Sequence, residues 1–476
     1  MTKTQTPPRR RPAVAIRALG VACALLLATA VGIGGVVGSA ALVGPVNSDS
    51  GPDGVAIQAA RTVSLPPNDS PDQALPDLDE AAPTPTPSGL QQALAGPMSA
   101  PVLGELSAQV LDPATGMVLL AQESTEAMQP ASTMKLYTAA AAAVVLDPGS
   151  RITTSVVQGA NPTEITVVAG GDPTLSSESS SVLNPGAATI QQLADAIKAA
   201  GITTVTKITV DNSIFAGPST AAGWGSGDAP STYAAPVYPF MADGGRSQPG
   251  DDASMRYGDP DLHAAQLLAT ALGSPDAQVA RGTAAAGAPP IAAVQSAPIE
   301  QLIEQMILIS DNTLAECLGR LVAKVTGREA SFTGAVEAVT ATMQTLGVDL
   351  TGYTGYDASG LSGQNLTSAQ SLGSLMALVA GDQPGALDVL ASALAVSGYN
   401  GTLATRFEAG PSGGAAGRVR GKTGTLTGVS SLAGTVLTND GRVLVYSFIS
   451  NGGGATTTVR AALDEIAATI AGCGCR

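Results

Sequence analysis

The pattern of hydrophobic and polar residues becomes regular near residue 90, and it opens with two short segments on either side of a turn. Apolar and polar side chains alternate over residues 105–110, and residues 117–120 are all apolar. The stretch between them, Asp112-Pro113-Ala114-Thr115-Gly116, is rich in turn-forming residues. Two short strand-like segments joined by such a turn predict a β-hairpin.

The next apolar segment has no polar face. Residues 132–146 are rich in Ala and apolar nearly all round, which predicts a buried helix of the kind found at the centre of an enzyme domain. Helical periodicity returns at residues 299–308, 314–325 and 335–346. The chain ends in predicted strands at 429–437 and 442–450 and a predicted helix at 457–470.

A long segment of different character separates the buried helix from the later helices. It contains predicted strands at 152–157, 165–169 and 203–210 and a predicted helix at 190–200. Gly- and Pro-rich loops connect these elements, and this mixture predicts an inserted α/β domain over residues 148–297. The remaining folded residues, 89–147 and 298–476, form the other predicted domain.

The N-terminal part of the chain has the composition of a targeting segment and a spacer. Four arginines in residues 1–17 precede an uncharged run at 18–43 that is long enough to span a bilayer. This run is a retained signal anchor or a cleaved signal peptide, and its length favours the anchor. The basic residues stay in the cytoplasm, so the chain after residue 43 is expected outside the cytoplasmic membrane. Residues 44–88 are rich in Pro, Asp and Ser and predict a disordered linker.

Composition excludes several classes of function. The 476-residue chain has a net charge of −15, so it lacks the basic stripe that binding to nucleic acid requires. Its one histidine, His263, lies in a segment typical of a helix start. A Ser-His-Asp triad would depend on this residue, and a zinc site would have few ligands. We therefore expect a packed or capping histidine and no metal site.

Three cysteines follow the apolar run and are expected in an oxidising compartment. A bridge between Cys473 and Cys475 would be strained, so the sequence favours a disulfide from Cys317 to one of these two. Such a bridge would tie the end of the chain to the core. The alternative is three free thiols.

Three short polar motifs stand out within the predicted elements. They are Ser132-Thr133-Met134-Lys135, Ser310-Asp311-Asn312 and Lys422-Thr423-Gly424. The chain has six lysines, and two of them lie in these motifs. At no other place does a Ser precede a Lys by three positions or an Asn by two. The set is typical of an enzyme that attacks a carbonyl with a serine and passes through an acyl-enzyme.

The first motif pairs a nucleophile with a base. Residues three apart share a helix face, so Lys135 can reach the hydroxyl of Ser132 and remove its proton. A lysine acts as a base only when its pKa is lowered, and burial in an apolar helix with Lys422 nearby would lower it. The backbone N–H of Ser132, at the helix start, is free to stabilise an oxyanion. The alternative is an ordinary capping serine with a lysine that reaches the surface.

The other two motifs also have structural explanations when each is considered by itself. Ser310-Asp311-Asn312 joins two predicted helices and could be a helix cap. Lys422-Thr423-Gly424, with Thr425 after it, could be a turn before a strand. A cation, a hydroxyl and a glycine that permits close backbone approach also suit a substrate carboxylate at a strand edge. The three motifs together, in this order and after an export signal, favour the catalytic interpretation.

With these motifs the chain resembles the class C penicillin-binding proteins of the penicillin-binding protein 4 type, which are D-alanyl-D-alanine carboxypeptidases and endopeptidases. The resemblance covers about residues 90–472. It also rests on residues 170–175, on residues 211–215 with Trp224 after them, and on residues 233–236, 357–362 and 398–403. It implies an α/β (α+β) fold. This fold is a serine β-lactamase and transpeptidase-like domain, an antiparallel sheet flanked by helices with an all-helical subdomain, and it carries an inserted mixed α/β domain.

The resemblance also implies a role for each residue of the motifs. Ser132 would be the nucleophile, Lys135 its base, and Ser310 would pass the proton to the leaving amine with help from Lys422. Asn312 would bind the substrate amide, and Lys422, Thr423 and Thr425 would hold the terminal carboxylate beside Gly424. The backbone N–H groups of Ser132 and Thr425 would form the oxyanion hole. No cofactor is implied. The implied substrates are peptidoglycan stem peptides ending in D-Ala-D-Ala, the implied inhibitors are β-lactams, and the implied location is the cell wall or the outer side of the membrane.

Two departures and two alternatives remain. The inserted segment is shorter than in some members of the family, and Asn400 stands where an Asp is common. A β-lactamase shares the motifs, but the class A enzymes need a Glu-x-x-x-Asn loop after the second motif, and none occurs between Asn312 and Asp357. A non-catalytic cell-wall-binding module with an idle site is the other alternative, and the intact motifs disfavour it.

Overall fold

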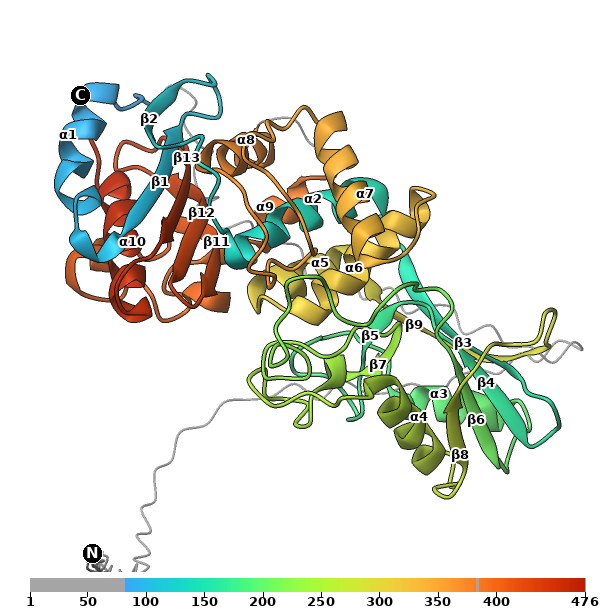
Figure 1. Ribbon diagram of the computed structural model, residues 1–476. Coiled ribbons are helices and arrows are strands. Elements are labelled where there is room, and N and C mark those ends of the chain that lie inside the picture. Colours follow the sequence, from blue (N-terminus) through green and yellow to red (C-terminus); the bar gives the residue numbers. More distant parts are fainter. Residues whose placement is uncertain (1–81, 382–384, 476) are drawn as a thin grey trace, which may run out of the picture. The chain divides into compact units, whose positions relative to one another are not determined.

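The computed structural model describes residues 82–381 and 385–475, and an antiparallel sheet is its central feature (Figure 1). The sheet has six strands in the order β10-β11-β12-β13-β1-β2. The predicted hairpin is confirmed, and its first strand pairs with β13, which joins the two ends of the described chain. The strands are β1 (Glu105–Leu111), β2 (Val118–Gln122), β10 (Ala395–Val396), β11 (Val419–Leu426), β12 (Val429–Leu437) and β13 (Val443–Asn451).

Both faces of this sheet are covered, because its central strands are apolar on both sides. Along β13, Tyr446 and Phe448 join the core formed with α1 (Pro87–Met98) and α10 (Thr456–Ala471). Val445 and Ile449, which alternate with them, join the core on the opposite face, where α8 (Ala369–Val379) packs. The alternation follows from the two-residue period of a strand. Figure 1 shows α1 and α10 together on one side of the sheet.

The predicted buried helix lies at the centre of a helical layer. It is α2 (Lys135–Val145), it follows a 3₁₀ turn at Ala131–Met134, and its alanines from Ala139 to Ala143 are almost completely buried. Small side chains let the neighbouring helices approach closely. These neighbours are α5 (Ile299–Leu308), α6 (Asn312–Val325), α7 (Phe332–Thr345) and α9 (Asp388–Ala393). The first three confirm the helices predicted at 299–308, 314–325 and 335–346.

A second sheet lies within residues 151–298 and has a core of its own. It has five strands in the order β8-β6-β4-β3-β9, with parallel and antiparallel pairs, and helices α3 and α4 pack against its strands. The sheet strands are β3 (Arg151–Gln158), β4 (Glu164–Val168), β6 (Lys207–Asp211), β8 (Gln278–Arg281) and β9 (Pro290–Pro298). The helices are α3 (Ile190–Ala199) and α4 (Pro260–Ala271), and a separate parallel pair joins β5 (Asp172–Leu175) to β7 (Phe240–Ala242).

His263 lies on α4 and is packed, as the sequence predicts. Its ring stacks on Tyr257 with 3.7 Å between the ring centroids. Burial lowers the pKa of His263. The residue does not line the cavity described below.

Of the predicted N-terminal basic segment, anchor and linker, the structure describes only the end of the linker, from residue 82. The predicted basic segment and anchor, residues 1–43, lie outside the described residues. Helix α1 begins at Pro87, inside the segment predicted as linker, because Thr86 caps it and Pro fits the first helical turn. No helix within residues 82–381 and 385–475 is long and apolar enough to cross a membrane.

The predicted disulfide from Cys317 is wrong. Cys317 is a free, buried thiol on α6, where it packs against Met241 and Phe332. Cys473 follows α10 in the core of the six-stranded sheet and is bonded to Cys475, with 5.0 Å between the Cα atoms. The two regions belong to different cores, so the end of the chain is held by packing and not by a bridge to α6.

Candidate active site

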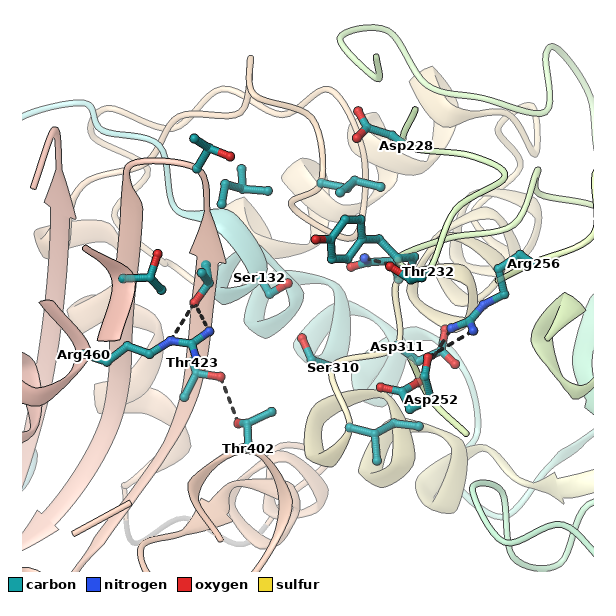
Figure 2. A pocket seen from close by; sticks show the side chains of 18 residues that line it. Ser132, Asp228, Thr232, Asp252, Arg256, Ser310, Asp311, Thr402, Thr423 and Arg460 are labelled. Carbon is teal, nitrogen blue, oxygen red and sulfur yellow. Dashed lines mark hydrogen bonds and ion pairs between the residues drawn. The ribbon is translucent and has the colours of Figure 1, made fainter. Parts of the chain in front are cut away.

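The three motifs meet at one cavity of about 530 Å³ (Figure 2). Of the residues predicted for the site, five line it: Ser132, Ser310, Asn312, Thr423 and Thr425. Lys135 and Lys422 are fully buried and lie behind the lining, each with its amine on a serine hydroxyl of the wall. Gly424 lies behind it too, against the backbone of Ser132. The fold therefore brings together residues that are far apart in the sequence.

Ser132 sits in a backbone turn that its neighbours hold in place. The preceding residue, Ala131, has φ of 48°, a left-handed conformation that costs energy for a residue with a Cβ. Two hydroxyls fix the turn through the carbonyl of Pro130, which accepts from Thr133 Oγ1 at 2.8 Å and from Ser431 Oγ at 2.6 Å. Strain supported in this way is typical of a functional site, where it orients one side chain.

The amine of Lys135 is oriented as a base toward Ser132. It lies 2.5 Å from Asn312 Oδ1, 2.7 Å from the carbonyl oxygen of Ser359 and 3.0 Å from Ser132 Oγ. The first two atoms only accept hydrogen bonds, so they take the two N–H groups of a neutral amine. The lone pair of that amine then faces Ser132. Burial lowers the pKa of Lys135 from 10.5 to about 8, although the charges of Asp357 and Glu316 act in the opposite direction.

A buried carboxyl group holds the loop that carries Ser359. Glu316, one turn after Asn312 on α6, is completely buried and accepts from the backbone N–H of Ala358 at 3.1 Å and of Ser359 at 2.8 Å. Burial and the charge of Asp357 raise the pKa of Glu316 to about 8. Glu316 could not be recognised as a site residue from the sequence, because a single Glu on an amphipathic helix is usually solvated.

The second serine of the site is paired with the second lysine. Lys422 donates to Ser310 Oγ at 2.8 Å and to the carbonyl oxygen of Thr423 at 2.8 Å. Burial and the nearby charge of Lys135 hold the pKa of Lys422 well below its usual range. Ser310 has φ of 61°, so its backbone is also held in the left-handed region. Two Ser–Lys pairs thus border the same cavity.

The middle residue of the second motif has a structural task. Asp311 is the cap of α6 and accepts from the backbone N–H of Leu314 at 2.9 Å, as the helix-cap interpretation predicted. It also forms a buried ion pair with Arg246 at 2.8 Å, and Arg246 continues to Asp252 at 2.5 Å. Burial alone would raise the pKa of Asp311, but the charges of Arg246 and Arg256 lower it to about 2. These contacts attach the loop after β7 to the second motif.

Gly424 lets strand β11 approach the nucleophile. A Cβ at this position would lie 2.6 Å from the carbonyl oxygen of Pro130, closer than real Cβ contacts. It would lie 3.0 Å from the backbone nitrogen of Ser132, which is tighter than most such contacts. It would also collide with Ser431 Oγ on β12, where Ser431 is the register partner of Gly424. Only a glycine permits this approach. Ser132 and Thr425, on either side of this close approach, both line the cavity.

The strand side of the cavity holds the remaining hydroxyls. Thr423 Oγ1 lies 2.9 Å from Thr402 Oγ1, and Thr425 Oγ1 donates to the carbonyl oxygen of Gly424 at 2.8 Å. Arg460, from α10, donates to Thr425 Oγ1 at 2.8 Å through Nη2 (Figure 2). Thr402 lies in the stretch 398–403 that carries the family resemblance, but it had no predicted role in the site. Arg460 belongs to no motif, and only the fold brings it to the strand. Within the described residues, no group of three or more His, Cys, Asp or Glu side chains is placed to hold a metal.

Comparison with known protein families identifies this chain. The sequence model of the D-Ala-D-Ala carboxypeptidase 3 (S13) family matches residues 90–252 and 246–470. The chain belongs to this family. Carboxypeptidase DacB of Mycolicibacterium smegmatis is 39% identical over 447 residues, which are 92% of this chain and 94% of the relative. A carboxypeptidase of Mycobacterium tuberculosis is 42% identical over 406 residues, 84% of this chain and 87% of the relative.

A solved structure supports the fold. Penicillin-binding protein 4 of Haemophilus influenzae superposes on this chain with a TM-score of 0.66 at 21% identity, over 80% of this chain and 97% of that protein. Membership in the S13 family confirms the resemblance to the class C penicillin-binding proteins, and the shared architecture confirms the predicted fold class.

Proposed function

We propose that Ser132 is the nucleophile and Lys135 the general base of this serine D-alanyl-D-alanine carboxypeptidase of the S13 family. The observation that supports the assignment is the position of the Lys135 amine. It is 3.0 Å from Ser132 Oγ, with its two N–H directions taken by Asn312 Oδ1 and the carbonyl oxygen of Ser359. A lysine pKa near 8 leaves a usable fraction of neutral amine at physiological pH.

The reaction begins with attack on the last peptide bond of a stem peptide. Ser132 Oγ bonds to the carbonyl carbon of the penultimate D-Ala while Lys135 takes the hydroxyl proton. Negative charge develops on the carbonyl oxygen, and the backbone N–H groups of Ser132 and Thr425 stabilise it. Ser310 then gives a proton to the nitrogen of the terminal D-Ala, which leaves as the C–N bond breaks. The proton that Lys135 took from Ser132 is passed on to Ser310, so Lys135 becomes neutral again, and Lys422 holds the Ser310 hydroxyl in place by a hydrogen bond. Water later attacks the ester on Ser132 and releases the shortened peptide.

Each remaining residue of the site fits one part of this substrate. The amide of Asn312 is fixed from both sides, because its oxygen accepts from Lys135 and its nitrogen donates to the carbonyl oxygen of Tyr233 at 3.1 Å. It borders the cavity where the backbone of the acyl-donor peptide would lie. Thr423 and Thr425 border the cavity from strand β11, and this side would receive the leaving residue. β-Lactams acylate the same serine, because their strained amide carbonyl enters in place of the peptide carbonyl.

We further propose that the enzyme acts outside the cytoplasmic membrane. The basic residues in 1–17 and the uncharged run at 18–43 support export with the N-terminal segment as an anchor or a cleaved signal. Peptidoglycan lies on that side of the membrane. Fractionation of cells that express the full chain, with mass measurement of the N-terminal peptide, distinguishes an anchored from a cleaved protein.

Product analysis on purified muropeptides tests the proposed reaction. The enzyme should convert pentapeptide stems to tetrapeptides with release of D-alanine, and the Ser132→Ala variant should not. Loss of a general base usually lowers the rate by about 10²–10⁴-fold, so Lys135→Ala should release D-alanine more slowly by that factor. Normal release of D-alanine by Ser132→Ala would exclude the assigned nucleophile.

A further inference from the structure

Arg460 is a charged residue on the wall of the active-site cavity that no motif includes. It lies on the first half of α10, and its guanidinium donates to Thr425 Oγ1 through Nη2 at 2.8 Å and Nε at 3.3 Å. Its side chain is exposed and lines the cavity beside Thr423 and Thr425. Figure 2 shows it on the strand side, across the cavity from Arg256 and Asp252.

The positive charge of Arg460 is not neutralised by a carboxylate. The natural partner would be Asp464, one helical turn further along α10. Asp464 is instead bound by Arg406, with Nη2 to Oδ1 at 2.5 Å and Nε to Oδ2 at 3.0 Å. Within residues 82–381 and 385–475, no ion pair involves Arg460. The guanidinium is therefore held toward the cavity by a neutral hydroxyl alone.

The other cations of the site are poorly placed to receive an anion. Lys422 is buried and does not line the cavity. Its amine already donates hydrogen bonds to Ser310 Oγ and to the carbonyl oxygen of Thr423. Arg256 lines the cavity, but its side chain is 2% exposed and lies 3.6 Å from Asp252. The Thr425 hydroxyl already donates to a backbone carbonyl. An anionic group entering from the strand side therefore meets Arg460 first.

We infer that Arg460 binds the free carboxylate of the leaving residue and so selects substrates whose leaving group carries that carboxylate. This inference rests on the proposed acyl-transfer at Ser132. With the attacked carbonyl oxygen at the N–H of Thr425, the terminal carboxylate lies about one residue length away, ~3.8 Å, which is within reach of the guanidinium bound to the Thr425 hydroxyl. A planar guanidinium binds a carboxylate through two parallel hydrogen bonds. When the substrate binds, the guanidinium of Arg460 gives up its hydrogen bond to Thr425 Oγ1 and donates to the substrate carboxylate instead. The Thr425 hydroxyl is then free to bind the substrate as well.

The test compares two acyl-D-alanyl thioesters that differ only in the leaving group. One leaving thiol carries a carboxylate and the other carries the corresponding carboxamide, and both acyl groups are activated enough for turnover. In Arg460→Gln, kcat/KM for the carboxylate substrate should fall about 10–100-fold, the usual size of a lost charge-assisted hydrogen bond. For the carboxamide substrate it should change less than about twofold, because that substrate brings no charge to the guanidinium.

Two further variants separate charge from geometry. Arg460→Lys keeps the charge but cannot form the paired bonds, so its preference for the carboxylate should be intermediate. Lys324→Gln removes one exposed positive charge from the end of α6, away from the cavity, and should leave the preference unchanged. An Arg460→Gln enzyme with the wild-type ratio of carboxylate to carboxamide turnover would overturn the inference. Failure of the proposed function would show differently, because the wild-type protein itself would then turn over neither thioester through Ser132.

Discussion

The rate at which Ser132 is acylated should follow the titration of Lys135. The amine lies 3.0 Å from Ser132 Oγ and has to be neutral to accept its proton. Burial lowers the pKa of Lys135 from 10.5 to about 8. With that pKa, about 1% of the amine is neutral at pH 6, about 10% at pH 7 and about half at pH 8.

The lowered pKa gives the size of the increase in neutral Lys135 that burial causes. A solvated lysine would be neutral in only about 0.03% of molecules at pH 7, so burial increases the reactive fraction roughly 300-fold. The protonated form predominates below the pKa, so acylation should become slower as the pH falls. We expect the rate to rise about tenfold per pH unit up to about pH 7 and to level off above about pH 9.

The assay is the second-order rate of labelling by a fluorescent penicillin, measured at each pH with a thermal melt to verify folding. Lys135→Arg is the control, because a guanidinium stays charged and cannot serve as the base. It should label about 10²–10⁴-fold more slowly at every pH. A wild-type rate that is constant from about pH 6 to about pH 9, or that still rises steeply at about pH 10, would refute the reasoning.

A single substitution should move this profile in a known direction. Glu316 is ionised mainly above about pH 8, and there its charge raises the pKa of Lys135, so Glu316→Gln should shift the midpoint of the acylation profile to lower pH. Glu300→Gln removes a carboxyl group from the exposed face of α5 and should leave the midpoint in place. Equal midpoints in the wild-type and Glu316→Gln proteins would mean that the two groups are not coupled.

Three further predictions concern residues that hold the site in place or lie outside it. Gly424→Ala should slow penicillin acylation about 10²-fold, because the new Cβ pushes strand β11 away from Ser132 by part of an ångström or more. As a control, a Cβ at Gly250 meets no atom within 4 Å, so Gly250→Ala should be labelled by penicillin at the normal rate. Arg246→Gln leaves the buried carboxylate of Asp311 unpaired and should lower the free energy of unfolding in urea by about 3–5 kcal/mol, and a loss below about 1 kcal/mol would contradict the buried pair. Peptide mapping without reduction should find Cys317 as a free thiol that is alkylated only after unfolding, and a peptide cross-linked through it would contradict the structure.

The elements with a strong local pattern could be predicted from the sequence, and those that depend on distant partners could not. The hairpin of β1 and β2 has strand-like segments around a cluster of turn residues, and helix α2 is a long Ala-rich apolar run. Both form where predicted. Strands β5 and β7 are only four and three residues long and form because they pair with each other across the inserted segment. Nothing in their own sequences indicates a strand.

The same distinction applies to the site. The three motifs could be predicted, since unusual spacings of Ser, Lys and Asn carry the chemistry by themselves. Glu316 and Arg460 could not, because each looks like a solvated residue of an amphipathic helix until the fold places it under a loop or beside Thr425. The pairing of Cys317 was mispredicted for a related reason. Sequence distance and compartment do not show that its helix and the end of the chain lie in different cores.

Mass spectrometry of the penicillin-treated protein tests the central claim most directly. We predict one penicilloyl adduct on the peptide that holds Ser132, slow loss of that adduct over time, and no adduct in the Ser132→Ala protein. A class A β-lactamase would release the drug over many turnovers, and residues 312–357 lack the Glu-x-x-x-Asn loop that such an enzyme requires. An adduct on another peptide, or rapid release of hydrolysed penicillin, would contradict the account.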